Sequence, residues 1–437
     1  MSPERSFACE RAIRPGLLDA FAYAGAVAVR PLQALMAAPS LLFVATLTLM
    51  LFRPANVGLL PFDRLAFFVL AFVVLLRILL RKDEMPVCLS LTLPMLGLSA
   101  LALSGNWTHT FDPEMWSVVA AQFLVPFAMY HFASSVFVTE DSVRHLERFC
   151  LLTLAYLCFI SVAFLAGQTQ LVFPRFILDA GVEMHADRAR GPLLQAVANG
   201  VTLNLLGLLA FEIYRRKRMA GMVAGALLLL WPLAIFATMT RSVWLSAALS
   251  LCAVSLLKQG ARLPRFSLIG PLAALVVISA IAVSSRAASS SQERFEDRGT
   301  VDFRWAVSEL SWQMFREKPL LGWGQGEFAR EIETRMSEFR PETYAAHNTF
   351  LDILVEHGMV GLFLYLWIIT SLFRLSRNSQ WLQYTWPICL GVYLVNACCV
   401  VMNYQFVNAL LFTFAGVVAS QRGSHLEQPF ACNEHLD

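Results

Sequence analysis

Three side chains, Arg190, Arg241 and His347, are the strongest candidates for chemistry in this sequence. Arginine presents a planar fork of donors that matches phosphate oxygens, and it stays charged at any working pH. Histidine near its ordinary pKa can take a proton from a hydroxyl group at neutral pH. Two arginines and one histidine in a shared site would therefore stabilise a diphosphate leaving group and activate an acceptor hydroxyl.

Each of these residues also has a plainer explanation. A single arginine at the end of a membrane helix usually extends its charged group to the lipid head groups. A single histidine at a helix end is more often a hydrogen-bonded structural residue. The residues alone leave both explanations open, so the elements that would carry them have to be considered.

The composition predicts an all-α integral membrane protein. Of the 437 residues, 57% are apolar and only 15% are charged, and the mean hydropathy is +0.59. Uncharged apolar runs approach or exceed the roughly 20 residues that cross a bilayer as a helix. We expect about twelve transmembrane helices, at 32–52, 62–80, 86–104, 116–138, 149–167, 193–214, 220–239, 242–257, 266–284, 358–373, 384–402 and 404–420.

The basic residues predict the orientation of these spans. They gather in alternate connections, for example in Arg215-Arg216-Lys217-Arg218, while the intervening short connections carry few. The positive-inside rule then places both termini, residues 1–31 and 421–437, in the cytosol as tails. The same bias explains the net charge of +3 without a nucleic-acid partner. None of the nine cysteines falls in an outer loop or a CxxC pair, and the sequence predicts neither a metal site nor a cofactor.

Two outer connections carry most of the polar residues. The first, about 168–192, ends in HADRARGPLL, and the second is a large loop at 285–357 between the span groups 32–284 and 358–420. The large loop contains an amphipathic helix, with Asp302 as its expected cap, Pro319 as its stop and an apolar stripe. The stripe consists of Phe303, Ala306, Leu310 and Met314, with Val307 beside them, while Trp305, Trp312 and Phe315 suit a membrane interface.

A glycine-rich turn follows this helix. The run LGWGQGEF at 321–328 predicts a tight turn that approaches a partner surface, with Trp323 and Gly324 as candidates for substrate contacts. A solvated lid that only holds the fold together is the alternative for this loop.

The segment HNTFLDILVEHGMVG places His347 at the head of an apolar run. If the helix is continuous, His347 and Gly358 share one face; if Gly358 breaks it, residues 347–357 form a short re-entrant piece. Both alternatives leave His347 at the outer face. Arg241 begins another span, with Leu245 one turn further on, and Arg190, with Arg188, precedes the span near 193. Three separate segments thus bring their polar residues to the same side of the membrane.

These segments together resemble the O-antigen ligase and polymerase superfamily. HNTFLDILVEHGMVG is similar to its pattern of histidine and asparagine, nine residues, then Gly-x-x-Gly. Arg241 through Leu245 match its Arg-x-x-x-Leu pattern, EKPLLGWGQGEF resembles its Pro-x-x-Gly-x-Gly element, and RARGP at 188–192 is similar to its arginine–glycine segment. The following LLQAVANG lacks the Asn-Pro that many members carry, and this leaves the local acceptor or glycan contacts open.

The resemblance implies a GT-C-like, metal-independent, inverting glycosyltransferase of the bacterial inner membrane. It would use undecaprenyl-diphosphate-linked glycan at the periplasmic face and lipid A-core or a growing polysaccharide as acceptor, among membrane lipids. His347 would be the catalytic base, Arg241 and Arg190 would hold the diphosphate with Arg188 as a rival to Arg190, and Asn348 would orient the histidine or meet sugar.

The signature spacing favours a ligase over an O-antigen or exopolysaccharide polymerase of the same superfamily. A secondary transporter or flippase is less favoured, because its ionisable residues would lie near the midplane and those of the predicted spans do not.

Overall fold

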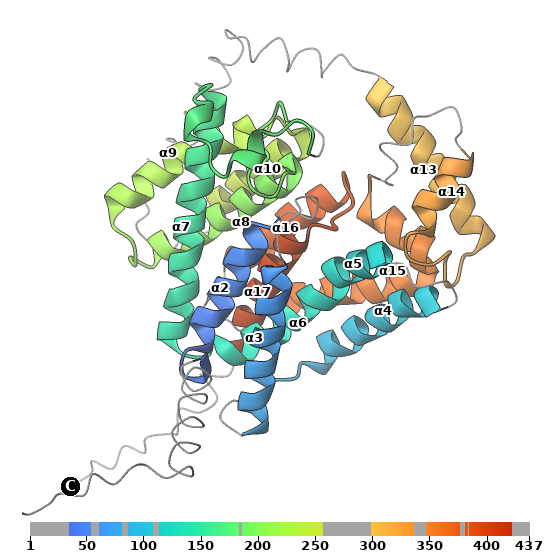
Figure 1. The fold of residues 1–437 in the computed structure, drawn as a ribbon, viewed down its shortest axis with the longest axis horizontal. Coiled ribbons are helices and arrows are strands. Elements are labelled where there is room, and N and C mark those ends of the chain that lie inside the picture. The colour runs from blue at the N-terminus through green and yellow to red at the C-terminus, as the bar shows by residue number, and fades with distance from the viewer. Residues whose placement is uncertain are drawn as a thin grey trace, which may run out of the picture.

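The computed structural model describes residues 35–53, 61–80, 86–107, 113–182, 186–256, 299–335, 347–375, 381–382 and 384–421. The regular elements of these residues are all helices (Figure 1). They are α2 (Pro39–Leu51), α3 (Phe62–Leu79), α4 (Leu89–Trp107), α5 (Pro113–Val119), η1 (Ala120–Leu124), α6 (Val125–Val136), α7 (Glu140–Leu165), η2 (Thr169–Leu171), η3 (Arg175–Leu178), α8 (Ala196–Arg215), α9 (Gly221–Ala237), α10 (Arg241–Leu256), α13 (Gly299–Glu317), α14 (Glu327–Arg335), α15 (Thr349–Leu375), α16 (Trp386–Ala397) and α17 (Gln405–Ser420).

These helices support the prediction of an integral membrane protein. Four helical stretches are long and apolar enough to cross a bilayer, namely Met115–Val136, Glu140–Leu165, Ala196–Arg215 and Thr349–Leu375. Shorter apolar helices, α2, α4, α9, α10, α16 and α17, coincide with other expected spans. The span at 266–284 and both terminal tails lie outside the described residues, apart from Gln421 at the start of the C-terminal one, and the total of twelve stays a prediction.

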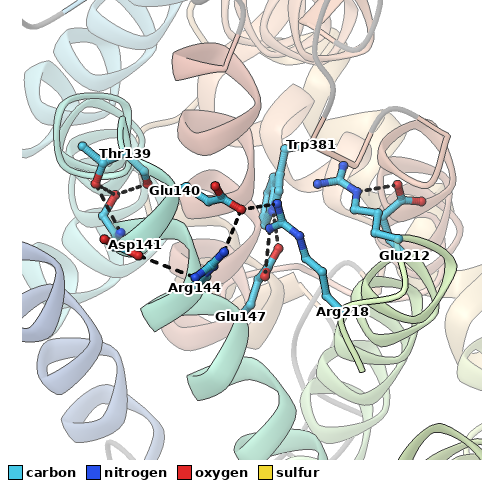
Figure 2. A network of polar contacts seen from close by, with 10 residues as sticks. Thr139, Glu140, Asp141, Arg144, Glu147, Glu212, Arg218 and Trp381 are labelled. Carbon is cyan, nitrogen blue, oxygen red and sulfur yellow. Dashed lines mark hydrogen bonds and ion pairs between the residues drawn. The ribbon is translucent and has the colours of Figure 1, made fainter. Parts of the chain in front are cut away.

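The helices alternate in direction, so the described bundle has two ends of different character. At the basic end, Glu147 of α7 accepts from Trp381 at 3.1 Å and pairs with Arg218 at 3.5 Å. Arg218 also pairs with Glu140 at 2.7 Å (Figure 2). Arg215 pairs with the buried Glu212 at 2.5 Å. Because Glu147 and Glu212 are both buried, these arginines balance charge that would otherwise be costly to remove from water.

The opposite end, which we call the loop end, contains residues 168–182, 186–194, 238–241, 347–349 and 398–404. It receives the carboxyl ends of α7, α9 and α16 and the amino ends of α8, α10, α15 and α17. The candidates Arg188, Arg190, Arg241 and His347 therefore lie at the end remote from the arginine cluster.

The large loop folds against the bundle rather than extending away from it. The helices α13 and α14 lie beside α15 (Figure 1). Val307, Leu310 and Met314 of α13 pack with Phe328 and Ile332 of α14 and with Val355 of α15. The predicted apolar stripe is thus confirmed for the three α13 positions, while the side chain of Phe303 lies outside the described residues. The sequence analysis did not anticipate α14, because its nine residues are mostly charged.

One expected boundary of the amphipathic helix differs in the structure. Asp302 does not cap the amphipathic helix, because α13 already includes Gly299 and the residues after it. Trp305 and Trp312 are 76% and 49% exposed, and their position at a membrane interface stays a prediction.

Candidate active site

The segment that carries Arg188 and Arg190 is fastened to two helices at the loop end. The Ala189 amide donates to the Ala237 carbonyl at the end of α9 over 3.0 Å. The Ala189 carbonyl accepts from the Asn199 amide of α8 over 2.8 Å. Gly191 has a φ of 58°, and a Cβ there would lie 2.8 Å from the Asn199 side chain. Since Arg241 begins α10 shortly after Ala237, the arginine segment and Arg241 lie at the same place in the fold.

The guanidinium group of Arg190 is already occupied by backbone carbonyls. The side chain is fully buried and donates to the carbonyl of Ile177 at 2.9 Å, to that of Val182 at 2.6 Å and to that of Asp179. These contacts fold residues 175–182 back onto the segment. The buried Arg190 side chain therefore holds residues 175–182 against the segment that carries it, and its hydrogen bonds satisfy its charge.

Arg188 and Arg241 are more accessible than Arg190. Arg188 is half-buried and Arg241 is exposed at the first position of α10. The first turn of a helix leaves backbone N–H groups without helical acceptors and carries a partial positive charge, so it favours an anion nearby. Of the three candidate arginines, Arg188 and Arg241 are therefore the ones with accessible side chains.

His347 stands immediately before α15. It is half-buried and has a φ of 48°, a left-handed conformation that is uncommon for residues other than glycine. Asn348 caps α15, since its side-chain oxygen accepts from the amides of Phe350 at 2.9 Å and Leu351 at 3.3 Å. The expectation that Asn348 orients the histidine or meets sugar remains a prediction, and capping is the role that its contacts show.

Thr349 joins the histidine segment to the turn between α16 and α17, a contact that the sequence analysis missed. Its hydroxyl donates to the Val400 carbonyl at 2.9 Å and accepts from the Met402 amide at 3.0 Å. No sequence pattern marks such a residue, because its partner lies 51 positions away.

The same turn leads back to α10. Asn396, near the end of α16, donates to the Ser246 hydroxyl at 3.0 Å, and Asn204 of α8 donates to it at 3.2 Å. Ser246 lies within the second turn of α10 after Arg241. Hydrogen bonds thus link the elements that carry Arg188, Arg241 and His347, and all three residues lie at the loop end of the bundle.

The glycine loop, residues 319–326, lies against the middle of α15. Gly358 breaks that helix with a φ of 65° and a ψ of −164°, so of the two alternatives for the histidine segment the structure has the broken helix. Gly324 has a φ of 103°, and its amide donates to the Glu356 carbonyl at 2.8 Å. The partner surface that the loop approaches is therefore α15 of the same chain.

Trp323 packs between the loop helices. Its indole N–H donates to the Met314 carbonyl at 2.9 Å, and the Lys318 ammonium lies 3.7 Å from a ring centroid. Arg335 also faces this indole at 5.2 Å and binds both oxygens of Glu317. Hydrogen bonding from Arg335 lowers the pKa of the Glu317 carboxyl. Substrate contact by Trp323 stays a prediction, and its present partners belong to the loop.

The buried carboxylates Asp352 and Glu356 were missed in the sequence analysis. Both lie on the half of α15 that precedes the break, where they are 7% and 4% exposed. A sequence signal existed, since two acidic residues one turn apart in an apolar run are costly unless they have defined partners.

The described residues thus form a bundle of largely apolar helices with Arg188, Arg241 and His347 at one end. Residues 224–366 match the family model described as O-antigen ligase. The matched third of the chain includes Arg241, Trp323 and His347 but begins after Arg188 and Arg190. This match supports the predicted resemblance to the O-antigen ligase and polymerase superfamily, and with it a role of the ligase or polymerase type in polysaccharide biosynthesis. A comparison with curated proteins gave no match.

Proposed function

We propose that the protein transfers a glycan from undecaprenyl diphosphate to an acceptor hydroxyl at the periplasmic face of the bacterial inner membrane. The observation that carries this proposal is the family match at residues 224–366, combined with the gathering of Arg188, Arg241 and His347 at one end of the bundle. The positive-inside bias places that end outside the cytosol.

The proposed reaction is a displacement at the anomeric carbon with inversion. The acceptor oxygen forms a bond to this carbon while the bond from the carbon to the diphosphate oxygen breaks. His347 takes the proton of the acceptor hydroxyl, and the diphosphate leaves with the bonding electron pair. Fixed guanidinium groups stabilise the charge that develops on the leaving diphosphate.

Arg241 and one arginine of the RARGP segment are proposed to hold the diphosphate. The sequence leaves Arg188 and Arg190 as alternatives. The contacts of the described residues favour Arg188, because the donors of Arg190 already bind the carbonyls of Ile177, Asp179 and Val182. On this reading Arg190 shapes the site and Arg188 contacts the substrate.

Lipid A-core is the acceptor that we favour, because the matched family is described as O-antigen ligase and the signature spacing fits a ligase. A polymerase of O-antigen or exopolysaccharide would use the same donor and the same three side chains. Deleting the gene and separating the cell's glycolipids on a gel distinguishes these acceptors. Loss of long chains from lipid A-core, with accumulation of lipid-linked polymer, supports the ligase. Single-repeat products indicate an O-antigen polymerase, and intact lipopolysaccharide with lost capsule or slime indicates an exopolysaccharide polymerase.

A further inference from the structure

The carboxylate of Glu356 is placed in an unusual environment. It lies on an apolar helix, and none of the ion pairs that the described residues form includes it. An ionisable side chain at such a position is costly unless hydrogen bonds satisfy its oxygens. The hydrogen-bond partners of Glu356 therefore show which contacts offset the cost of burying its carboxylate.

Both oxygens of Glu356 bind the glycine loop. One accepts from the Gly326 amide at 2.6 Å, and the other accepts from the Gln325 side-chain amide at 2.5 Å. The oxygen of the same Gln325 amide lies 3.1 Å from a ring nitrogen of His357. Gln325 also approaches Gln122 of η1 at 3.5 Å, so the carboxylate is the centre of a buried polar group shared by three segments.

The glycine loop also replaces the hydrogen bonds that the break in α15 removes. The Met359 amide donates to the Pro319 carbonyl at 2.9 Å, and the Val360 amide donates to the Leu320 carbonyl at 3.2 Å. In the other direction, the Trp323 amide donates to the Val355 carbonyl at 2.9 Å. Within a membrane the backbone groups at a helix break need such partners, since no water supplies them.

Two glycines make this approach possible. A Cβ on Gly322 would lie 2.5 Å from the Glu356 carbonyl group, and a Cβ on Gly358 would lie 2.2 Å from the Leu320 carbonyl oxygen. Both distances are shorter than atoms tolerate, so the loop and the break fit each other only as glycines.

We propose that Glu356 is a positioning residue for His347. Its carboxylate fastens the glycine loop to the break at Gly358 and so fixes one end of the half-helix 349–357, while Thr349 fixes the other end. His347 stands at the head of this half-helix. The inference rests on the proposed function, since the base role of His347 is what Glu356 would support.

The expected effect separates catalysis from donor binding. Without the carboxylate the half-helix keeps the Thr349 anchor at one end but only backbone hydrogen bonds to the glycine loop at the other. A displacement of about 1 Å at a catalytic group can lower the rate about 100-fold. Arg188 and Arg241 lie on other segments, so the affinity for the lipid diphosphate should change little. Glu356→Ala should therefore lower kcat with little change in KM for the donor.

The test compares Glu356→Ala and Glu356→Gln with Glu309→Ala, which changes an exposed glutamate of α13. Hydrogen exchange of residues 319–326 reports the contact directly, and transfer is measured with lipid-linked glycan extracted from cells that lack the gene. We expect Glu356→Ala to accelerate exchange of the Gly324 and Gly326 amides and to lower kcat. Glu356→Gln keeps an oxygen acceptor for Gly326 and should restore most of both. Glu309→Ala should match the unmodified protein in both measurements.

Unchanged exchange and unchanged kcat in Glu356→Ala would overturn the proposal, as would a loss of kcat in Glu356→Ala without faster exchange. If Glu356→Ala does not fold, Gln325→Ala removes one of the two carboxylate contacts and must show the same two changes to a smaller degree. Failure of the proposed function is distinguishable, because then the unmodified protein transfers no glycan while the exchange results stand by themselves.

Discussion

The contrast between Arg188 and Arg190 gives the sharpest prediction, because two arginines two positions apart should fail in different ways. Arg190→Ala removes three hydrogen bonds from a buried cation to the carbonyls of Ile177, Asp179 and Val182. Hydrogen bonds to charged groups contribute about 1.5–3 kcal/mol each, so even the lower figure gives a loss of roughly 4.5 kcal/mol in the free energy of unfolding for three bonds. Arg188→Ala removes a half-buried side chain, which costs far less.

The assay measures stability and transfer separately for each variant. Thermal unfolding of the purified protein in lipid nanodiscs gives the order of stability, and glycan transfer is measured at a temperature at which every variant is still folded. We expect Arg190→Ala to unfold at a clearly lower temperature and to keep partial transfer when folded. Arg188→Ala should unfold close to the unmodified protein and lose transfer.

Arg190→Lys provides the matched control. Lysine keeps the charge, but its ammonium group cannot reproduce the planar fork that reaches three carbonyls in different directions. We therefore expect Arg190→Lys to be destabilised as well, although less than Arg190→Ala. The reasoning is refuted if Arg190→Ala unfolds with the unmodified protein yet loses transfer, since Arg190 would then act on the substrate rather than on the fold.

The remaining predictions concern the base, the cation clamp and the glycine loop. His347→Ala and Arg241→Ala should each abolish transfer without lowering the amount of protein in the membrane, and near-normal transfer by either purified variant would remove its assigned role. Transfer should continue in EDTA, whereas inactivation that a divalent ion reverses would contradict the arginine clamp. Gly358→Ala should lower the unfolding temperature and the yield of protein, because the added Cβ would lie 2.2 Å from the Leu320 carbonyl oxygen and a φ of 65° disfavours alanine. Gly391→Ala is the control, because nothing lies within 4 Å of a Cβ added there.

Much of the architecture follows from the sequence alone. Long apolar runs predict membrane helices wherever they occur, since a helix is how a single chain satisfies its backbone in lipid. The sequence spacing predicts Arg241 at the start of a span and an amphipathic helix where α13 lies. The break at Gly358 is one of the two alternatives that the spacing leaves open. The alternation of basic connections predicted which residues share an end of the bundle, and the contacts at both ends agree with it.

Only the tertiary structure decided what several of these residues do. Arg188 and Arg190 have the same chemistry in the sequence, and they differ because the carbonyls of residues 177–182 fold around one of them. The sequence suggests substrate contacts for Asn348, Trp323 and Gly324. In the structure Asn348 caps α15, Trp323 packs among the loop helices, and the Gly324 amide donates to the Glu356 carbonyl. Hydrogen-bond partners that lie tens or hundreds of positions apart leave no periodic pattern in a sequence, whereas burial in a bilayer leaves a strong one. For that reason the sequence determined the helices and the end of the bundle at which polar residues gather, and the fold determined which of those residues remain accessible to a substrate.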